Sequence, residues 1–159
     1  MLKFNYRINQ TIIDRGIECF QLGKVNSVYK LSDKMYMASV SGERKYEVYI
    51  NVENEGIENS VCTCPCHYTC KHIVATSMYV SENKNKIIQT KKYNVEDIKM
   101  AIEVVDNFNA SINSTHYGSS EKYFIRGELE YEQINFNNIS KELKGKVENS
   151  FNSAKDYEC

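Results

Sequence analysis

The sequence of 159 residues has no tryptophan, a single proline and seven glycines, and it contains no long hydrophobic run. This composition excludes a collagen-like chain, and 42% hydrophobic residues exclude a wholly disordered one. No stretch approaches the ~20 apolar residues of a membrane span, and the N-terminus MLKFNYRINQ lacks the apolar core of a signal peptide. The sequence therefore predicts a cytoplasmic globular protein with no membrane partner.

The chain also lacks an overall excess of positive or negative charge. Lys and Arg number 20 and Asp and Glu number 21, giving a net charge of −1, so no global basic field indicates nucleic-acid binding. The two parts of the chain differ, however. Residues 1–92 carry 13 basic and 9 acidic side chains (+4), whereas residues 93–159 carry 7 and 12 (−5).

The N-terminal half predicts one helix followed by an antiparallel meander. Residues 11–24 have apolar side chains at helical spacing; Thr11 and Asp14 are expected to cap the start, and Gly23 to end the helix. Four short runs with strand character follow, separated by turn formers, and the third alternates apolar and polar residues as expected for one buried face. These runs are residues 25–31, 35–41, 44–52 and 57–62.

Beyond the meander the pattern becomes less regular. A helix is predicted after residue 70, then a basic linker, a helix capped by Asn94, a polar loop over residues 109–121, a strand pair within 122–136 and a last helix over 139–151. The expected fold class is α+β: an N-terminal helix, a meander leading into a strand-to-helix corner, and a mixed α/β C-terminal part. The expected organisation is a domain over 1–82, a linker over 83–93 and an extension over 94–159.

Six residues that can bind a metal lie within eleven positions at this corner. Strand side chains alternate, so Cys62 and Cys64 point to the same face and can bind one ion together. Cys70 and His72 can do the same where the chain turns into the following helix, whose N-terminus favours a thiolate. Cys66 and His67 are also within reach, so six candidates compete for the four positions around a zinc ion.

A shell of three cysteines and one histidine has no open position, which predicts a structural rather than a catalytic zinc ion. A thioredoxin-type dithiol is disfavoured because the CxxC spacing is absent. A Cys66–His67 dyad is disfavoured because adjacent residues of an extended segment point apart. An enzymatic metal would need a carboxylate base, and the nearest acids in sequence are Glu58 and Glu82.

The order Cys-x-Cys, a short gap and Cys-x-His, between strands and an apolar helix, resembles the SWIM zinc finger. The resemblance runs from about Arg15 to Val80 and implies that the zinc ligands are Cys62, Cys64, Cys70 and His72. It also implies a module that binds DNA or other proteins, found in bacteria near the N-terminus of SWI/SNF-type helicase-like ATPases. The chain has no GxxxxGK[ST] loop, so it is not itself expected to be an ATPase or another enzyme with a small-molecule substrate.

Two partner classes therefore stay open. In the first, basic side chains contact DNA phosphates, and Tyr68 and Tyr79 add stacking surfaces. In the second, zinc only holds the corner and the chain is a protein-interaction or intramolecular scaffold module, with an exposed apolar patch expected on the last helix. The candidate nucleic-acid contacts are Lys71, Lys84, Lys86, Lys91 and Lys92.

Overall fold

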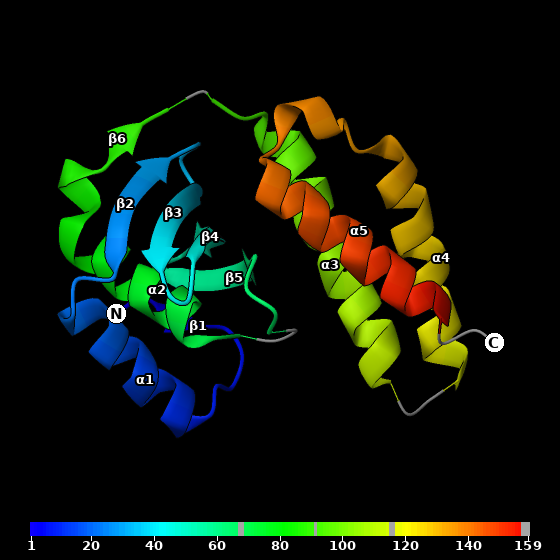
Figure 1. Cartoon of the computed structure of the whole chain (residues 1–159), viewed down its shortest axis with the longest axis horizontal. Helices are drawn as coiled ribbons and strands as arrows, with labels where there is room; N and C mark the ends of the chain where they lie inside the picture. The colour runs from blue at the N-terminus through cyan, green and yellow to red at the C-terminus, as the bar shows by residue number, and fades with distance from the viewer. Residues whose placement is uncertain (67–68, 91, 115–116, 157–159) are drawn as a thin grey trace. The chain divides into compact units, whose positions relative to one another are not determined.

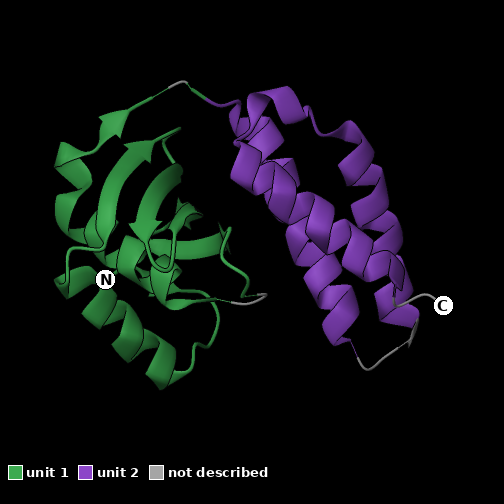
Figure 2. Ribbon diagram, in the orientation of Figure 1, with its two compact units in different colours: residues 1–92 green, residues 93–159 purple. Residues whose placement is uncertain are grey.

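The computed structural model describes residues 1–66, 69–90, 92–114 and 117–156 (Figure 1). The chain divides into two compact units, Met1–Lys92 and Tyr93–Cys159 (Figure 2). The predicted α+β class is confirmed: a helix and a meander open the chain, and a strand-to-helix corner follows them.

The first unit is built on a six-stranded sheet in the order β1-β5-β4-β3-β2-β6. The four inner strands are antiparallel, whereas the short outer strands β1 and β6 pair in parallel with their neighbours. All four predicted runs form strands, within one residue at each end. The strands are β1 (Lys3–Phe4), β2 (Val25–Lys30), β3 (Met35–Ser41), β4 (Lys45–Glu53), β5 (Gly56–Cys62) and β6 (Ile88–Gln89).

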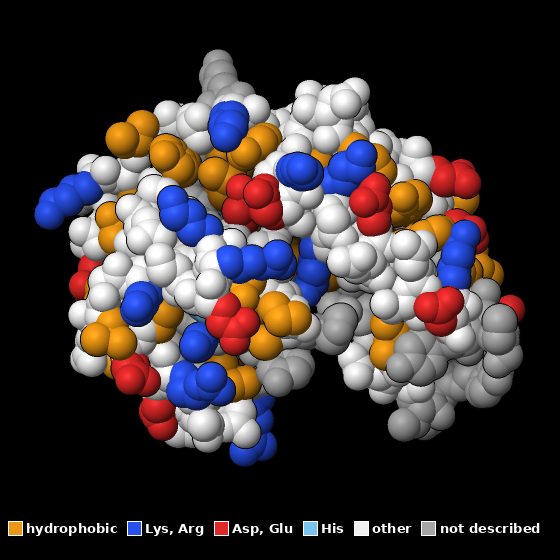
Figure 3. Space-filling model, in the orientation of Figure 1, with side chains coloured by type: hydrophobic (Ala, Val, Ile, Leu, Met, Phe, Trp, Pro, Cys, Tyr) orange, Lys and Arg blue, Asp and Glu red, His pale blue; other side chains and the backbone are white. Residues whose placement is uncertain are grey.

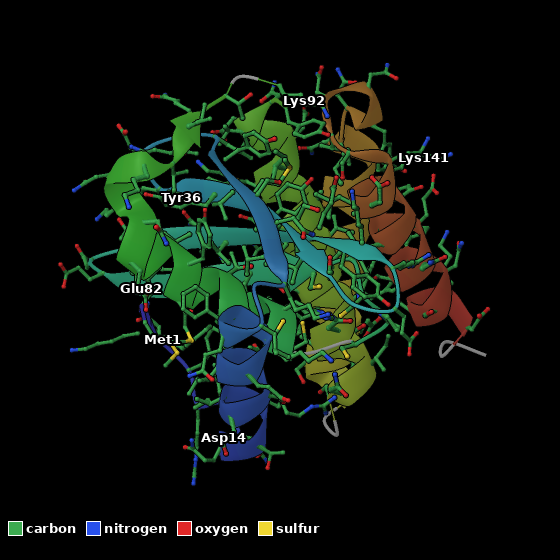
Figure 4. All side chains as sticks on the ribbon, turned by 60° about the vertical axis from the view of Figure 1, so that its left-hand side comes forward. Met1, Asp14, Tyr36, Glu82, Lys92 and Lys141 are labelled. Carbon is green, nitrogen blue, oxygen red and sulfur yellow. The ribbon has the colours of Figure 1, made fainter. Side chains whose placement is uncertain are left out.

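The inner strands bury side chains on both faces. On one face Tyr36, which is labelled in Figure 4, joins Val48 and Ile50 in the core that the sheet shares with the helices of this unit. On the other face Met37 and Tyr49 are also buried, at 7% and 0% exposure. The prediction of a single buried face is therefore wrong, because the large side chains of Met35, Met37 and Tyr49 interrupt the otherwise polar second face and are buried there.

Two helices complete the first unit, α1 (Gln10–Gln21) and α2 (Lys71–Asn83). Asn9, not Thr11, caps α1, since its side chain accepts a hydrogen bond from the Thr11 N–H. Gly23 ends the helix as predicted: at φ 65° it lets the N–H groups of residues 23 and 24 turn back onto the last carbonyls. The two helices pack closely, because a Cβ on Gly16 would overlap the side chain of Val74.

The segment expected as a linker has local structure of its own. It contains the 3-10 helix η1 (Lys84–Lys86) and β6, which pairs with β2 through Tyr29 and Ile88. These residues belong to the first compact unit up to Lys92.

The second unit is helical throughout its described residues. It consists of α3 (Val95–Asn113), α4 (Tyr117–Gln133), the 3-10 turn η2 (Phe136–Asn138) and α5 (Lys141–Asp156). As predicted, Asn94 caps α3 by accepting from the Glu96 N–H. The helices pack around Phe108, whose ring lies 5.7 Å from that of Phe124 and 5.1 Å from that of Phe151.

The strand pair predicted within residues 122–136 is wrong, and so is the polar loop before it. Leu129 and Tyr131 alternate with glutamates, but burial recurs at helical spacing, at Phe124, Gly127 and then Ile134. The glutamates, lysine and arginine of this segment are good helix formers and favour the helix as well. Within the described part of the chain, no helix is long and apolar enough to cross a membrane.

Candidate metal centre

The first pair of candidate ligands is held by the end of β5. Cys62 is the last residue of this strand and lies opposite Val48 of β4. Thr63 fastens the chain beyond it: its N–H donates to the Glu47 carbonyl, and its side-chain oxygen accepts from the Glu47 N–H, both at 2.9 Å. Cys64 is thereby carried back over the same face as Cys62, as the alternation of side chains predicts.

The second pair is held by the start of α2. Cys70 is the N-cap residue, with extended backbone angles (φ −117°, ψ 169°), and its carbonyl accepts from the N–H groups of Ile73 and Val74. His72 is the second residue of the helix. The turn from extended chain to helix at Cys70 brings the side chains of residues 70 and 72 to one side.

The structure brings these four side chains together in the interior. Their ligand atoms all lie within 4.8 Å of one another, and each residue is at most 5% exposed. The Nδ1 atom of His72 is 3.7 Å from the Cys62 sulfur and 3.6 Å from the Cys70 sulfur, and the sulfurs of Cys64 and Cys70 are 3.6 Å apart.

These spacings are those of a tetrahedral shell. With Zn–S near 2.3 Å and Zn–N near 2.0–2.1 Å, a regular tetrahedron has S–S edges of about 3.8 Å and S–N edges of about 3.6 Å. Three of the six distances between ligand atoms agree with these edges to within about 0.2 Å, and all six are at most 4.8 Å. The donor set, three thiols and one imidazole, also suits zinc in a closed site. The cluster therefore fits a structural zinc ion.

Backbone N–H groups point at two of the three sulfurs. The N–H of Cys64 lies 3.5 Å from the Cys62 sulfur, and the N–H of Cys66 donates to the Cys64 sulfur. Such donors stabilise negative charge on sulfur and orient the ligand. Cys66 thus acts at this site through its backbone, a role that ligand spacing alone does not predict.

The thiols oppose one another's ionisation. Hydrogen bonds from Cys62 and Cys70 lower the pKa of Cys64, so this thiol is the first to ionise. For Cys62, contacts with Cys64 and Cys70, together with burial, raise the pKa well above its ordinary value. For Cys70 the contact with Cys62 lowers the pKa, but the contact with Cys64, burial and the charge on Cys64 outweigh it and raise the pKa to about 12. A divalent cation among the sulfurs reverses this repulsion.

The remaining sulfur-bearing and acidic candidates lie apart from the four. Cys66 is half-buried and is not one of the clustered ligands, and His67 falls outside the described residues. Cys19 is part of the hydrophobic core. Glu58 is exposed on β5, and Glu82 lies ten residues beyond His72 on α2, about 15 Å along the helix axis.

The lysines predicted to contact nucleic acid fall into two groups. Lys71 is half-buried at the start of α2, whereas Lys84, Lys86 and Lys92 are exposed beyond its end; Lys91 lies outside the described residues. Thirteen helical residues separate the groups by about 20 Å. Lys24 and Lys71 both act electrostatically on the buried Cys19 thiol.

Among the described residues, and on the face shown in Figure 3, neither the charges nor Tyr79 forms an obvious nucleic-acid surface. On the face shown in Figure 3, the Lys and Arg side chains of the first unit are spaced out among neutral and acidic ones. Tyr79 is half-buried and packs against the core, and Tyr68 falls outside the described residues.

The β3–β4 turn covers the imidazole of His72. The rings of Tyr46 and His72 have centroids 5.0 Å apart and planes 35° apart, and the Arg44 guanidinium lies 5.5 Å from the Tyr46 centroid. A Cβ on Gly42 would lie 3.2 Å from the Nε2 atom of His72. Gly42 and Tyr46 are far from His72 in sequence, so only the folded hairpin reveals this contact.

Comparison with known proteins agrees with this geometry. Residues 46–80 match the family model of the SWIM zinc finger, a segment that runs from Tyr46 in β4 to Val80 in α2 and contains all four clustered residues. No curated protein and no solved structure matches the chain significantly.

Proposed function

We propose, from the SWIM match at residues 46–80, that this chain is a zinc-stabilised, non-catalytic binding module. In it Cys62, Cys64, Cys70 and His72 ligate one structural zinc ion. The buried group of four donors at tetrahedral spacing carries the proposal. A shell filled by four protein ligands leaves no position for a substrate or an activated water.

Zinc is expected to be needed for folding of the first unit. Structural zinc contributes about 10–16 kcal/mol to folding in small peptide domains at neutral pH. Chelator titration followed by far-ultraviolet circular dichroism tests this point. An unchanged spectrum and melting temperature after the metal has been removed would contradict it.

We infer that DNA is the partner and that the module assists nucleic-acid transactions in the company of a helicase-like ATPase. The net charge of +4 on residues 1–92 supports phosphate binding. Lys71, which lies between two of the proposed ligands in sequence, and Lys24 form one candidate contact group. Lys84, Lys86, Lys91 and Lys92 form the other. The helicase context rests on the family resemblance alone.

The test is DNA binding as a function of salt. Each lost phosphate contact should reduce the slope of log K against log salt by about 0.9 on duplex DNA, for all sequences alike. The double variants Lys24→Ala/Lys71→Ala and Lys84→Ala/Lys86→Ala, which each remove two contacts, should reduce the slope by about 1.8. Lys99→Ala/Lys122→Ala in the second unit is the matched control. Absence of binding to single- and double-stranded DNA at low salt would refute the proposal.

A scaffold function is the alternative, and one observation favours it. Ile125 and Leu129 lie four residues apart on α4 and are 51% and 57% exposed, so the exposed apolar side chains are on α4 instead of the last helix. Side chains at this spacing share a helix face. Unimpaired DNA binding in Ile125→Ser/Leu129→Ser, with loss of a protein partner captured by the wild-type chain, would assign this face to a partner.

A further inference from the structure

His72 presents its two ring nitrogens to different surroundings. Nδ1 faces the sulfurs of Cys62 and Cys70. Nε2 is buried and has no hydrogen-bond partner among the residues that the structure describes. Metal-bound histidines almost always donate the second ring N–H to a carboxylate, a carbonyl or a water, and that bond fixes the orientation of the ring. Among the described residues, the contacts that can fix the ring are those of packing.

The β3–β4 hairpin surrounds the far edge of the ring. Tyr46 is 5% exposed and its ring packs against that of His72. The space between Tyr46 and the hairpin turn is closed, because a Cβ on Gly42 would lie 2.6 Å from Cε2 of Tyr46 as well as 3.2 Å from Nε2 of His72. The first of these separations is shorter than any real Cβ contact, so a side chain at position 42 must displace the tyrosine ring.

The tyrosine cannot move away easily. It is held in β4 by antiparallel pairing with Val40 of β3, and its ring is flanked by the guanidinium of Arg44. The turn itself is closed by a 2.8 Å hydrogen bond from the Gly42 N–H to the Arg44 carbonyl. Displacement of Tyr46 is therefore transmitted to the imidazole against which it packs.

We propose that Gly42 and Tyr46 are positioning residues for the zinc ligand His72: they hold the imidazole by packing, in place of a hydrogen bond, so that Nδ1 is the metal-binding nitrogen. The inference rests on the proposed ligation of zinc by Cys62, Cys64, Cys70 and His72. It adds the residues that orient the histidine and the nitrogen that binds. With Nδ1 on the metal, the proton of the neutral ring is on Nε2.

The test uses the full-length chain and four variants. Gly42→Ala and Tyr46→Leu remove the packing, whereas Tyr46→Phe keeps the ring. Gly16→Ala is the control for a destabilising clash away from the metal, since its Cβ would overlap Val74 between α1 and α2. Zinc affinity is measured by competition with a chromophoric chelator, and the ligand set is read from the absorption bands of the cobalt(II) form.

Gly42→Ala and Tyr46→Leu are expected to lose about 10–100-fold in zinc affinity, the range found when residues that orient a metal ligand are removed. Their cobalt d–d bands should shift while the thiolate charge-transfer intensity stays, because the histidine moves and the cysteines do not. Tyr46→Phe should bind like wild type, and Gly16→Ala should lose stability but keep the wild-type bands. Long-range ¹H–¹⁵N correlation of the zinc form should show metal on Nδ1.

Wild-type affinity and bands in Gly42→Ala and Tyr46→Leu would overturn the inference, and so would zinc on Nε2. In both cases the proposed zinc site would still stand. If the wild-type chain binds no zinc, the proposed function itself fails, so the two failures are distinguishable.

Discussion

Cys64 and Cys66 lie two positions apart in the sequence. Exchanging each for serine tests which thiol belongs to the zinc shell. Cys64 is 2% exposed and its sulfur lies 3.6 Å from that of Cys70, whereas Cys66 is half-buried and outside the cluster. The link from Cys66 to the site is its backbone N–H, which donates to the Cys64 sulfur. Serine at position 66 keeps that N–H, so Cys66→Ser removes a thiol that lies outside the proposed zinc shell.

The size of the effect follows from dividing the binding energy among the ligands. If about 10–16 kcal/mol is shared by four ligands, one thiolate accounts for about 3–4 kcal/mol, or a 10²–10³-fold change in affinity. Cys64→Ser is expected to lose that much, and Cys66→Ser is expected to stay within about threefold of wild type, since its backbone donor remains. Competition with a chromophoric chelator at pH 7.5 or so measures both.

Cobalt(II) spectra show whether one thiol can replace the other. Thiolate charge-transfer intensity rises with the number of bound cysteines, so Cys64→Ser should show two thiolates and Cys66→Ser three. Three thiolates in Cys64→Ser would mean that Cys66 replaces the missing ligand. Equal losses in the two variants would refute the assignment of Cys64 and reopen the choice among the candidates.

Further predictions concern the second unit. Gly127→Ala should lower the free energy of unfolding by about 1–2 kcal/mol in urea titrations, since its Cβ would lie 2.7 Å from Phe108 and overpacking outweighs the gain in helix propensity. Gly145→Ala, with no atom within 4 Å of its Cβ, should instead raise it by up to about 1 kcal/mol; a gain in both variants would contradict the packing argument. Burial, and then Glu103, raise the pKa of Asp106 to about 7 from 3.8, so between these values the folded chain binds more protons than the unfolded one and stability falls as pH rises. Asp106→Asn should flatten this fall and raise stability at pH 8 by about 1–3 kcal/mol, and unchanged urea midpoints at pH 5 and 8 would count against the raised pKa of this half-buried carboxyl.

The parts of the fold that follow local rules could be predicted from sequence. Turn-forming residues bound the inner strands, and Gly23 and Asn94 mark a helix end and a helix start. The bounds of these elements are therefore predicted to within a few residues. The segment around Leu129 could not be predicted in this way. Its alternation with glutamates imitates a strand over a few residues, whereas tertiary packing, such as that of Gly127 under Phe108, favours the helix.

The metal centre also has one part that local sequence patterns predict and one part that they do not. Its four clustered donors lie within eleven residues, so strand alternation and a helix start suffice to bring them together, and their spacing in the sequence is informative. The residues around the imidazole come from a hairpin 26 to 30 positions earlier in the chain, and no local pattern connects Gly42 or Tyr46 to His72. The sequence pattern therefore identifies which residues are candidate metal ligands, whereas the tertiary fold decides how firmly the histidine is held. It follows that a variant chain can retain all four ligands in register and still bind zinc weakly if position 42 carries a side chain.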